Sequence, residues 1–353
     1  MIEAERRSQP APVPFPAQEP VAETQPAPAV GPATGTVSLG RRFFNIKTLL
    51  SFLLGIAILF TLFRVTGANL AEIVEQLRQV DPRIYAMAVV CYVLTFPFRG
   101  LRWQRLLANA GTHLPLGQLT EVIFISWFVN SVLPGKVGDV YRGYLLRREH
   151  SLSMSRTVGT VVAERVVDIF ALVTLLGVTG IFVLRNRVSP MVDHMLQAGW
   201  IGLAVMVVGM VVIYRFGERI AARFPEKVQS VYARFAHGTF ASLSSVRGLP
   251  ILILLTILAW CAEAGRLYFV MRALHVDLGL PAAFFTVAAI SLALIVPTPG
   301  GLGGVEAAFA GVLAVFGVPL QLALAVAVLD RLISYYSLII FGLPAFLLTK
   351  RGK

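Results

Sequence analysis

The sequence contains few charged residues, few cysteines and no regular spacing of metal ligands. Asp, Glu, Lys and Arg make up 14% of the 353 residues, well below the fraction of a typical soluble domain. The two cysteines, Cys91 and Cys261, lie inside apolar segments and show neither a metal spacing nor a disulfide framework. The five histidines are scattered, with no ligand spacing. These absences exclude a large soluble domain and predict that no metal is bound.

The short motifs of common enzymes are also missing. The sequence has no P-loop, no HExxH motif, no GxSxG nucleophile elbow and no Asp-x-Asp pair. Each of these motifs places a nucleophile, a base or a metal ligand where its chemistry needs it. We therefore predict no catalytic residues and no cofactor.

Apolar residues dominate the chain. Hydrophobic residues make up 56% of it, and the mean hydropathy is +0.74, which is the composition of an integral membrane protein. A transmembrane helix needs about 20 apolar residues. Suitable stretches lie at about 46–66, 84–107, 157–184, 197–215, 249–272 and 320–348. We therefore predict an all-α polytopic helical bundle with about six full spans.

The net charge of +12 comes from basic residues that cluster beside the apolar segments. They precede the first span, end the second and follow the last: Arg41, Arg42 and Lys47; Arg99, Arg102 and Arg105; Lys350 and Arg351. Cytoplasmic loops are enriched in Lys and Arg, and such residues contact anionic lipids. We therefore predict a multi-pass protein of the cell membrane, with both termini in the cytoplasm, that binds lipids and not nucleic acid.

Composition divides the chain into four parts. Residues 1–40 are rich in proline and alanine without any hydrophobic periodicity, which predicts a disordered cytoplasmic tail. Residues 41–216 and 249–353 form two transmembrane halves. Residues 217–248 mix basic and apolar positions at helical spacing, as in an amphipathic connector on the membrane surface. A short amphipathic helix over 68–80 is predicted in the outer interface.

Two breaks rich in glycine and proline interrupt the apolar segments at corresponding positions of the halves. Residues 134–140 read P-G-K-V-G-D-V, and residues 299–305 read P-G-G-L-G-G-V. Irregular backbone at membrane depth is tolerated only where protein covers it or where it lines a polar cavity. Interrupted segments at matching places in two halves indicate a transporter binding site. We predict re-entrant hairpins at about 119–148 and 282–317, which enter from opposite faces as an inverted repeat.

An acid–arginine pair follows each break after 31 or 32 positions, Glu164–Arg165 in one half and Asp330–Arg331 in the other. A charge at the centre of an inserted helix costs roughly 2.5 to 3.5 kcal/mol, so these side chains need partners. One interpretation is a set of buried salt bridges that hold the bundle together. The other is that Arg165 and Arg331 converge on a water-filled cavity and bind an anionic headgroup.

The predicted substrate site takes charged residues and glycines from both halves. Its members are Arg165, Arg331, Glu164, Asp168, Asp330, Lys136, Arg142, Gly135, Gly138, Gly300, Gly301, Gly303 and Gly304. Asp139 and Glu306 follow the breaks and are candidates for proton or cation coupling, or are ordinary acids at helix starts. The free N–H groups of those helix starts are expected to favour an anion. Glu263, Arg266 and Tyr335 are secondary candidates.

Four motifs resemble those of the lysylphosphatidylglycerol synthase transmembrane-region family, also called flippase-like domain proteins. They are N-S-V-L-P-G-K-V-G-D-V-Y-R at 130–142, E-R-V-V-D at 164–168, P-T-P-G-G-L-G-G-V-E at 297–306 and L-D-R-L-I-S-Y-Y at 329–336. The resemblance covers roughly residues 45–349. It implies a membrane protein that moves lipids between leaflets or serves a lipid, polyprenyl-linked sugar or hopanoid pathway.

Synthase members of that family attach an amino acid to lipid with a large soluble domain after the spans, and these 353 residues contain no such domain. We therefore expect a flippase-like transporter of an anionic or polyprenyl-linked lipid. Two alternatives stay open. One is a membrane-embedded lipid-modifying enzyme, and the other is an accessory scaffold whose partners are lipid-synthesis enzymes.

Overall fold

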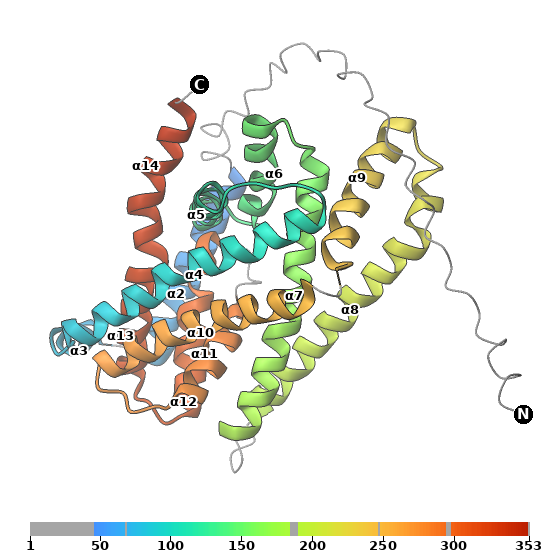
Figure 1. The fold of residues 1–353 in the computed structure, drawn as a ribbon. Coiled ribbons are helices and arrows are strands. Elements are labelled where there is room, and N and C mark those ends of the chain that lie inside the picture. The colour runs from blue at the N-terminus through green and yellow to red at the C-terminus, as the bar shows by residue number, and fades with distance from the viewer. Residues whose placement is uncertain (1–45, 68, 184–189, 246–247, 294–297, 352–353) are drawn as a thin grey trace, which may run out of the picture. The chain divides into compact units, whose positions relative to one another are not determined.

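The computed structural model describes residues 46–67, 69–183, 190–245, 248–293 and 298–351. The described residues form helices and turns, with no strand among them, as predicted (Figure 1). The helices are α2 (Ile46–Thr66), α3 (Leu70–Arg78), α4 (Pro82–Asn109), α5 (Leu116–Val132), α6 (Val137–His150), α7 (Met154–Val183), α8 (Pro190–Ala221), α9 (Glu226–Leu243), α10 (Leu249–Ala273), α11 (Leu280–Ala293), η3 (Pro299–Gly301), α12 (Gly304–Val315), α13 (Leu320–Arg331), η4 (Leu332–Tyr336) and α14 (Ser337–Arg351). The predicted tail over 1–40 lies outside the described residues.

Five helical segments within the described ranges are long and apolar enough to cross a membrane. They are Pro82–Asn109, Met154–Val183, Trp200–Ala221, Leu249–Ala273 and Leu320–Thr349. A sixth is counted when Phe52–Val65 and Leu70–Arg78, which are bent by 95° from each other, are taken as one span. The prediction of a polytopic helical membrane protein is therefore confirmed.

Both predicted breaks interrupt the helices where the glycines and prolines lie. The first separates α5 from α6, and Gly135 and Lys136 there have φ angles of 80° and 53°. The second separates α11 from α12 and contains the single turn η3. Gly303 at its end has φ of 81°, and a Cβ atom there would lie 2.7 Å from the carbonyl oxygen of Gly55. The backbone at this position therefore requires glycine.

α4 and α10 pack against each other at the centre of the bundle and run in opposite directions (Figure 1). The N–H of Asp81, which caps the start of α4, donates to the carbonyl of Ala273 at the end of α10 at 3.0 Å. At the other end, the Asn109 side chain donates to the carbonyl of Ser242, shortly before α10, at 2.9 Å. These are the second and fifth predicted spans, and their opposite directions agree with the predicted inversion.

Segments of the two halves also interlock around this central pair. α7 packs against α11, α5 packs against η3, and α14 packs against α5. The break in one half thereby contacts the hairpin of the other. The packing brings together segments that lie roughly 100 to more than 200 positions apart in the chain.

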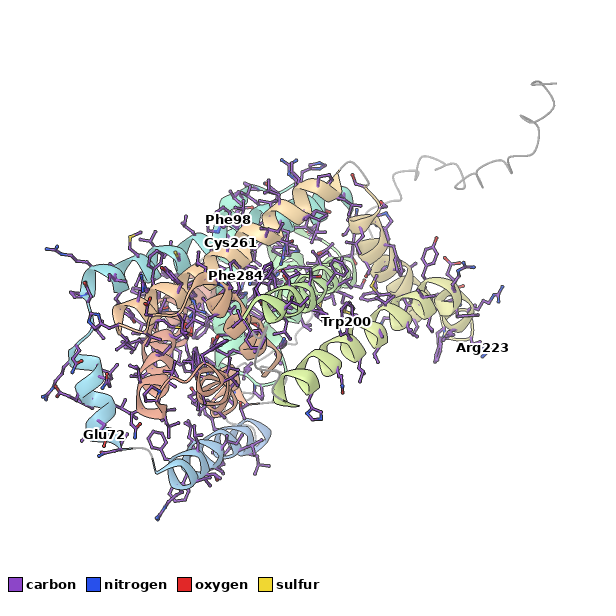
Figure 2. All side chains as sticks on the ribbon, turned by 90° about the horizontal axis from the view of Figure 1, so that it is seen from below. Glu72, Phe98, Trp200, Arg223, Cys261 and Phe284 are labelled. Carbon is purple, nitrogen blue, oxygen red and sulfur yellow. The ribbon has the colours of Figure 1, made fainter. Side chains whose placement is uncertain are left out.

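The outermost part of the bundle is α8, which packs mainly on α7 and α9. Its large apolar side chains are exposed, including Trp200, labelled in Figure 2, and Val205, with exposed fractions of 57% and 68%. Exposed apolar side chains on a long apolar helix are suited to contact with lipid. The predicted connector forms α9, and its Gly238 approaches the Arg156 carbonyl of α7 so closely that a Cβ atom would lie 2.1 Å from it.

Candidate functional site

A cavity of about 690 Å³ lies where the two breaks meet. Its volume falls within the range of about 300 to 1,000 Å³ that encloses small ligands. The charged side chains that line it come from both halves: Arg99, Lys136, Asp139, Arg165, Asp168, Glu263, Arg266, Asp330 and Arg331. Gly135, Gly300, Gly301 and Tyr335 line it as well. Most of the predicted site residues are therefore brought together.

In the first half, the acid that follows the break pairs with the arginine of the next helix. Asp139 lies in the first turn of α6, and its Oδ2 is 3.0 Å from the Nε of Arg165 on α7. Arg165 also approaches Asp168 at 3.4 Å, one turn further along α7. The guanidinium group therefore spans two carboxylates on the cavity wall.

The second half repeats this arrangement. Glu306 lies in the first turn of α12, and its Oε1 is 2.9 Å from the Nε of Arg331, at the end of α13. Each half thus joins an acid after the break to an arginine on the following helix. The repeat that the sequence spacing predicts therefore extends to side-chain contacts.

Arg331 and Arg165 differ in how much of each guanidinium group is available to a ligand. Arg331 also donates to the carbonyl of Gly300 at 2.7 Å and to that of Gly301 at 3.1 Å, and its side chain is 9% exposed. The Arg165 side chain is 30% exposed, and its hydrogen bonds among the described residues go to Asp168 and Asp139. Arg331 therefore stabilises the irregular backbone of the second break, whereas Arg165 is open to the cavity.

A second group of charges lies behind the cavity wall. Arg102 of α4 is 2.9 Å from Glu164 and 2.6 Å from Asp168, and Arg142 is 2.7 Å from Glu164. The side chains of Arg102, Arg142 and Glu164 are all 0% exposed. Glu164 and Arg142, predicted to contact substrate, are instead buried in salt bridges because α6 and α4 cover this face of α7.

Arg99 joins the charges of the two halves. It lies 3.7 Å from Asp168 and 3.4 Å from Glu263 of α10. Arg266 pairs with Glu263 at 3.1 Å and also with Asp330 of α13. Ion pairs therefore run continuously from α7 to α13. Glu263 and Arg266, secondary candidates in the sequence, are central members of this chain.

Sequence reasoning missed the roles of Arg99 and Arg102. Both follow an apolar stretch, so the sequence predicts that they lie at the charged end of the second span. The structure places Arg99 over the rings of Trp127 and Trp260, with its Cζ 4.9 and 5.6 Å from the ring centroids. One sequence signal could have predicted these roles. Arg99 and Arg102 are three residues apart, so they lie on one face of the helix.

At each helix start, one of the N–H groups expected to favour an anion is already bonded to a side chain. The N–H of Gly138 donates to Asn130 Oδ1 at 2.7 Å, and the N–H of Gly303 donates to Glu306 Oε2 at 2.7 Å. The acceptors belong to the flanking helices, Asn130 to α5 and Glu306 to α12. Gly138, Gly303 and Gly304 do not line the cavity; a Cβ atom on Gly138 would lie 2.0 Å from the Ser126 carbonyl, so this glycine serves the packing of α6 on α5.

Two further side chains in the cavity wall have unused donors. Trp260 Nε1 and Thr298 Oγ1 have no hydrogen-bond partner among the described residues, and both residues are 5% exposed. A buried polar group without a partner costs about 1 to 3 kcal/mol. The wall therefore has hydrogen-bonding capacity that the protein itself does not use.

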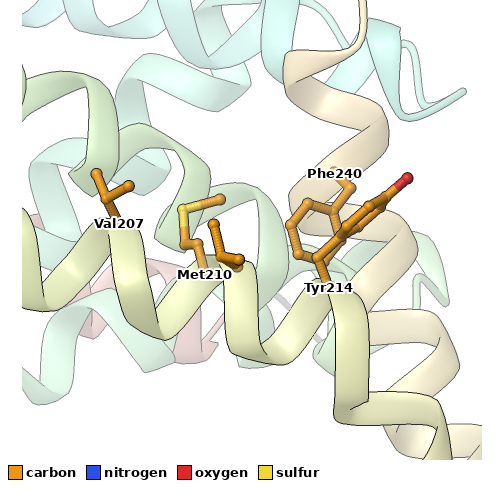
Figure 3. A pocket seen from close by; sticks show the side chains of 5 residues that line it. Val207, Met210, Tyr214 and Phe240 are labelled. Carbon is orange, nitrogen blue, oxygen red and sulfur yellow. The ribbon is translucent and has the colours of Figure 1, made fainter.

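A second cavity, of about 380 Å³, lies between α8 and α9 (Figure 3). Its lining is apolar and includes Val207, Met210 and the rings of Tyr214 and Phe240, which pack edge to face with centroids 5.0 Å apart. None of the described residues that line it is charged, so it is unsuited to a headgroup. Within the described parts of the chain, no group of three His, Cys, Asp or Glu is placed to hold a metal.

Comparison with known proteins identifies the family. The lysylphosphatidylglycerol synthase TM region matches residues 48–342. The UPF0104 membrane protein MJ1078 of Methanocaldococcus jannaschii is 33% identical over 229 residues, which are 64% of this chain and 95% of that protein. Glycosyltransferase AglD of Haloferax volcanii is 27% identical over 319 residues, 78% of this chain but 50% of AglD.

A third relative, the UPF0104 membrane protein PH1989 of Pyrococcus horikoshii, is 23% identical over 318 residues, 82% of this chain and 94% of that protein. The match to the family takes in both breaks and every residue that lines the charged cavity. The chain therefore belongs to the lysylphosphatidylglycerol synthase TM-region family.

Proposed function

We propose that this protein moves a lipid between the leaflets of the membrane, and that the charged cavity binds the lipid headgroup during the transfer. The observation on which this depends is the cavity of about 690 Å³ lined by both breaks and by charges of both halves. Binding sites at the interface of two repeats are typical of transporters that alternate their access.

The apolar part of the same cavity suits the rest of a lipid. One and two turns beyond Arg165, on the same face of α7, Ile169 and Leu172 line the cavity. Val287 and Ile290 of α11 line it from the other half. A ligand with a charged head and an apolar chain matches a wall of this composition better than a free ion does.

The test is lipid translocation in vesicles that contain the purified full chain. A fluorescent anionic lipid in the inner leaflet is protected from an added quencher until it is moved outward. Wild type is expected to expose the lipid faster than empty vesicles, and Arg165→Ala is expected to slow this by about tenfold, because one charged contact of the headgroup is lost.

Arg223→Ala is the matched control. Arg223 is exposed at the turn between α8 and α9 and has no ion pair among the described residues (Figure 2). It is expected to transport like wild type. Equal rates for wild type, Arg165→Ala and empty vesicles would refute the proposal.

A second candidate function follows from one relative. AglD is named a glycosyltransferase, and the chain matches half of it, so glycosyl transfer to a membrane carrier is the alternative. Product formation by the purified protein, from a sugar donor and a lipid acceptor without any other protein, would favour this alternative.

A further inference from the structure

We propose that the cavity selects a headgroup with one net negative charge, of the phosphodiester class, and that Lys136 is the residue that attracts it. This inference rests on the proposed lipid transport and deepens it by naming the substrate class. Three observations support this inference: the charge balance of the wall, the ion pairs of its arginines and the backbone conformation at Lys136.

The cavity wall has one more basic residue than acidic residues. Five basic residues line it, and four acids face them. Two further arginines, Arg102 and Arg142, and two further acids, Glu164 and Glu306, are paired with members of this network and add no net charge to it. The described charges around the cavity therefore leave a net charge of plus one.

That surplus belongs to Lys136. Each of the four arginines in the wall lies within 4.0 Å of a carboxylate, so none of them supplies the surplus charge. Lys136 is exposed, lines the cavity and forms no ion pair among the described residues. The acid nearest to it in sequence, Asp139, is held by Arg165 at 3.0 Å.

The backbone at Lys136 supports a role for its side chain. Lys136 has φ of 53° and ψ of 36°, in the left-handed region, where a residue with a Cβ atom costs roughly 1 to 2 kcal/mol. The internal repeat offers a direct comparison, because the equivalent position in the other break is Gly301, with φ of 71°. Glycine is the unstrained choice at this position, so a lysine there indicates a function for the ammonium group.

One surplus charge matches one negative charge. A phosphodiester has a single negative charge at neutral pH, whereas a phosphomonoester has about 1.5 to 2. A doubly charged headgroup would leave excess negative charge beside the four acids of the wall, and an uncompensated charge that is partly removed from water is disfavoured. A zwitterionic headgroup would leave the surplus of the wall unbalanced.

The experiment measures binding of defined ligands to the purified full chain in mild detergent by native mass spectrometry. Four ligands are compared: phosphatidylglycerol, phosphatidic acid and phosphatidylcholine with identical acyl chains, and water-soluble glycerophosphoglycerol. We expect phosphatidylglycerol to bind about tenfold more tightly than phosphatidylcholine, and more tightly than phosphatidic acid.

The variants are Lys136→Gln, Lys136→Arg and Lys227→Gln. Lys136→Gln is expected to abolish the preference for phosphatidylglycerol, and Lys136→Arg to keep most of it. Lys227 is an exposed lysine of α9 that does not line the cavity, so Lys227→Gln is expected to bind like wild type. Thermal unfolding of each variant checks that it is folded.

Two results would overturn the inference: an undiminished preference for phosphatidylglycerol in a folded Lys136→Gln protein, or tighter binding of phosphatidic acid than of phosphatidylglycerol by wild type. Binding of glycerophosphoglycerol as tightly as the lipid would support the charge selection but refute a lipid as the ligand. Transport in vesicles without any headgroup preference would refute the charge selection and leave the transport proposal standing. The two proposals therefore fail separately.

Discussion

Replacing Glu164 by glutamine tests whether the buried ion pairs stabilise the bundle. Glu164 is fully buried and accepts hydrogen bonds from Arg102 at 2.9 Å and Arg142 at 2.7 Å. In Glu164→Gln, Arg102 keeps Asp168 at 2.6 Å. Arg142 keeps Ser126 Oγ at 3.1 Å and a distant Asp139 at 4.0 Å. The main loss therefore falls on Arg142, whose charge becomes largely unpaired.

The size of the effect follows from this geometry. Removing one partner of a buried salt bridge costs about 3 to 5 kcal/mol, because the other charge is left unpaired. Since Arg102 keeps one carboxylate, we expect a loss near 3 kcal/mol. A loss of 1 kcal/mol lowers the melting temperature by about 2 to 4 °C in a chain of 150 to 250 residues, and by less in a longer one. We therefore expect a decrease of roughly 5 °C.

The assay is thermal unfolding of the purified protein in mild detergent, followed by tryptophan fluorescence. Glu75→Gln is the matched control, because its pair with Arg78 is exposed, at 60% and 74% for the two side chains, and an exposed pair contributes about 0 to 1 kcal/mol. The double change Glu164→Gln with Arg142→Gln removes the unpaired charge and is expected to recover part of the loss. A Glu164→Gln protein as stable as Glu75→Gln would refute the reasoning.

Two further predictions concern the breaks. Gly138→Ala is expected to destabilise the protein by about 1 to 3 kcal/mol, because the new Cβ would lie 2.0 Å from the Ser126 carbonyl. Gly177→Ala on α7 is the control and is expected to be neutral or stabilising, because nothing lies within 4 Å of its Cβ position. The melting temperatures of the two variants are compared. Arg331→Gln is expected to lower the melting temperature more than Arg165→Gln, because Arg331 also bonds two break carbonyls. Arg165→Gln is expected to weaken lipid binding more, and the opposite ranking in both assays would contradict the assigned roles.

The acid–arginine contacts of the two halves accommodate both interpretations of these pairs, as buried salt bridges and as a substrate site. From the sequence alone, these two interpretations are alternatives. Arg102, Arg142 and Glu164 are enclosed and paired, as the first requires. Arg165 and Arg331 both line the cavity, as the second requires. Under the proposed function, the two roles therefore belong to different residues of one charged network.

The sequence by itself determined the helical membrane architecture, the two breaks and the matched pairs that follow them. All of these depend on local physics. Apolar runs of sufficient length form spanning helices, proline and glycine end them, and residues three or four apart share a helix face. The opposite directions of α4 and α10 followed from counting spans, and the hydrogen bond from Asp81 to Ala273 agrees with them.

Only the tertiary structure decided which charges pair and which one remains. Arg99 reaches Asp168 and Glu263, which lie 69 and 164 positions away, and no spacing rule relates residues on different helices. Lys136 and Arg142 look alike as basic residues beside a break, yet α4 and α7 enclose Arg142 while Lys136 stays open to the cavity. The difference arises because the packing of helices, and not their order in the chain, sets the distance between charges and their access to a ligand.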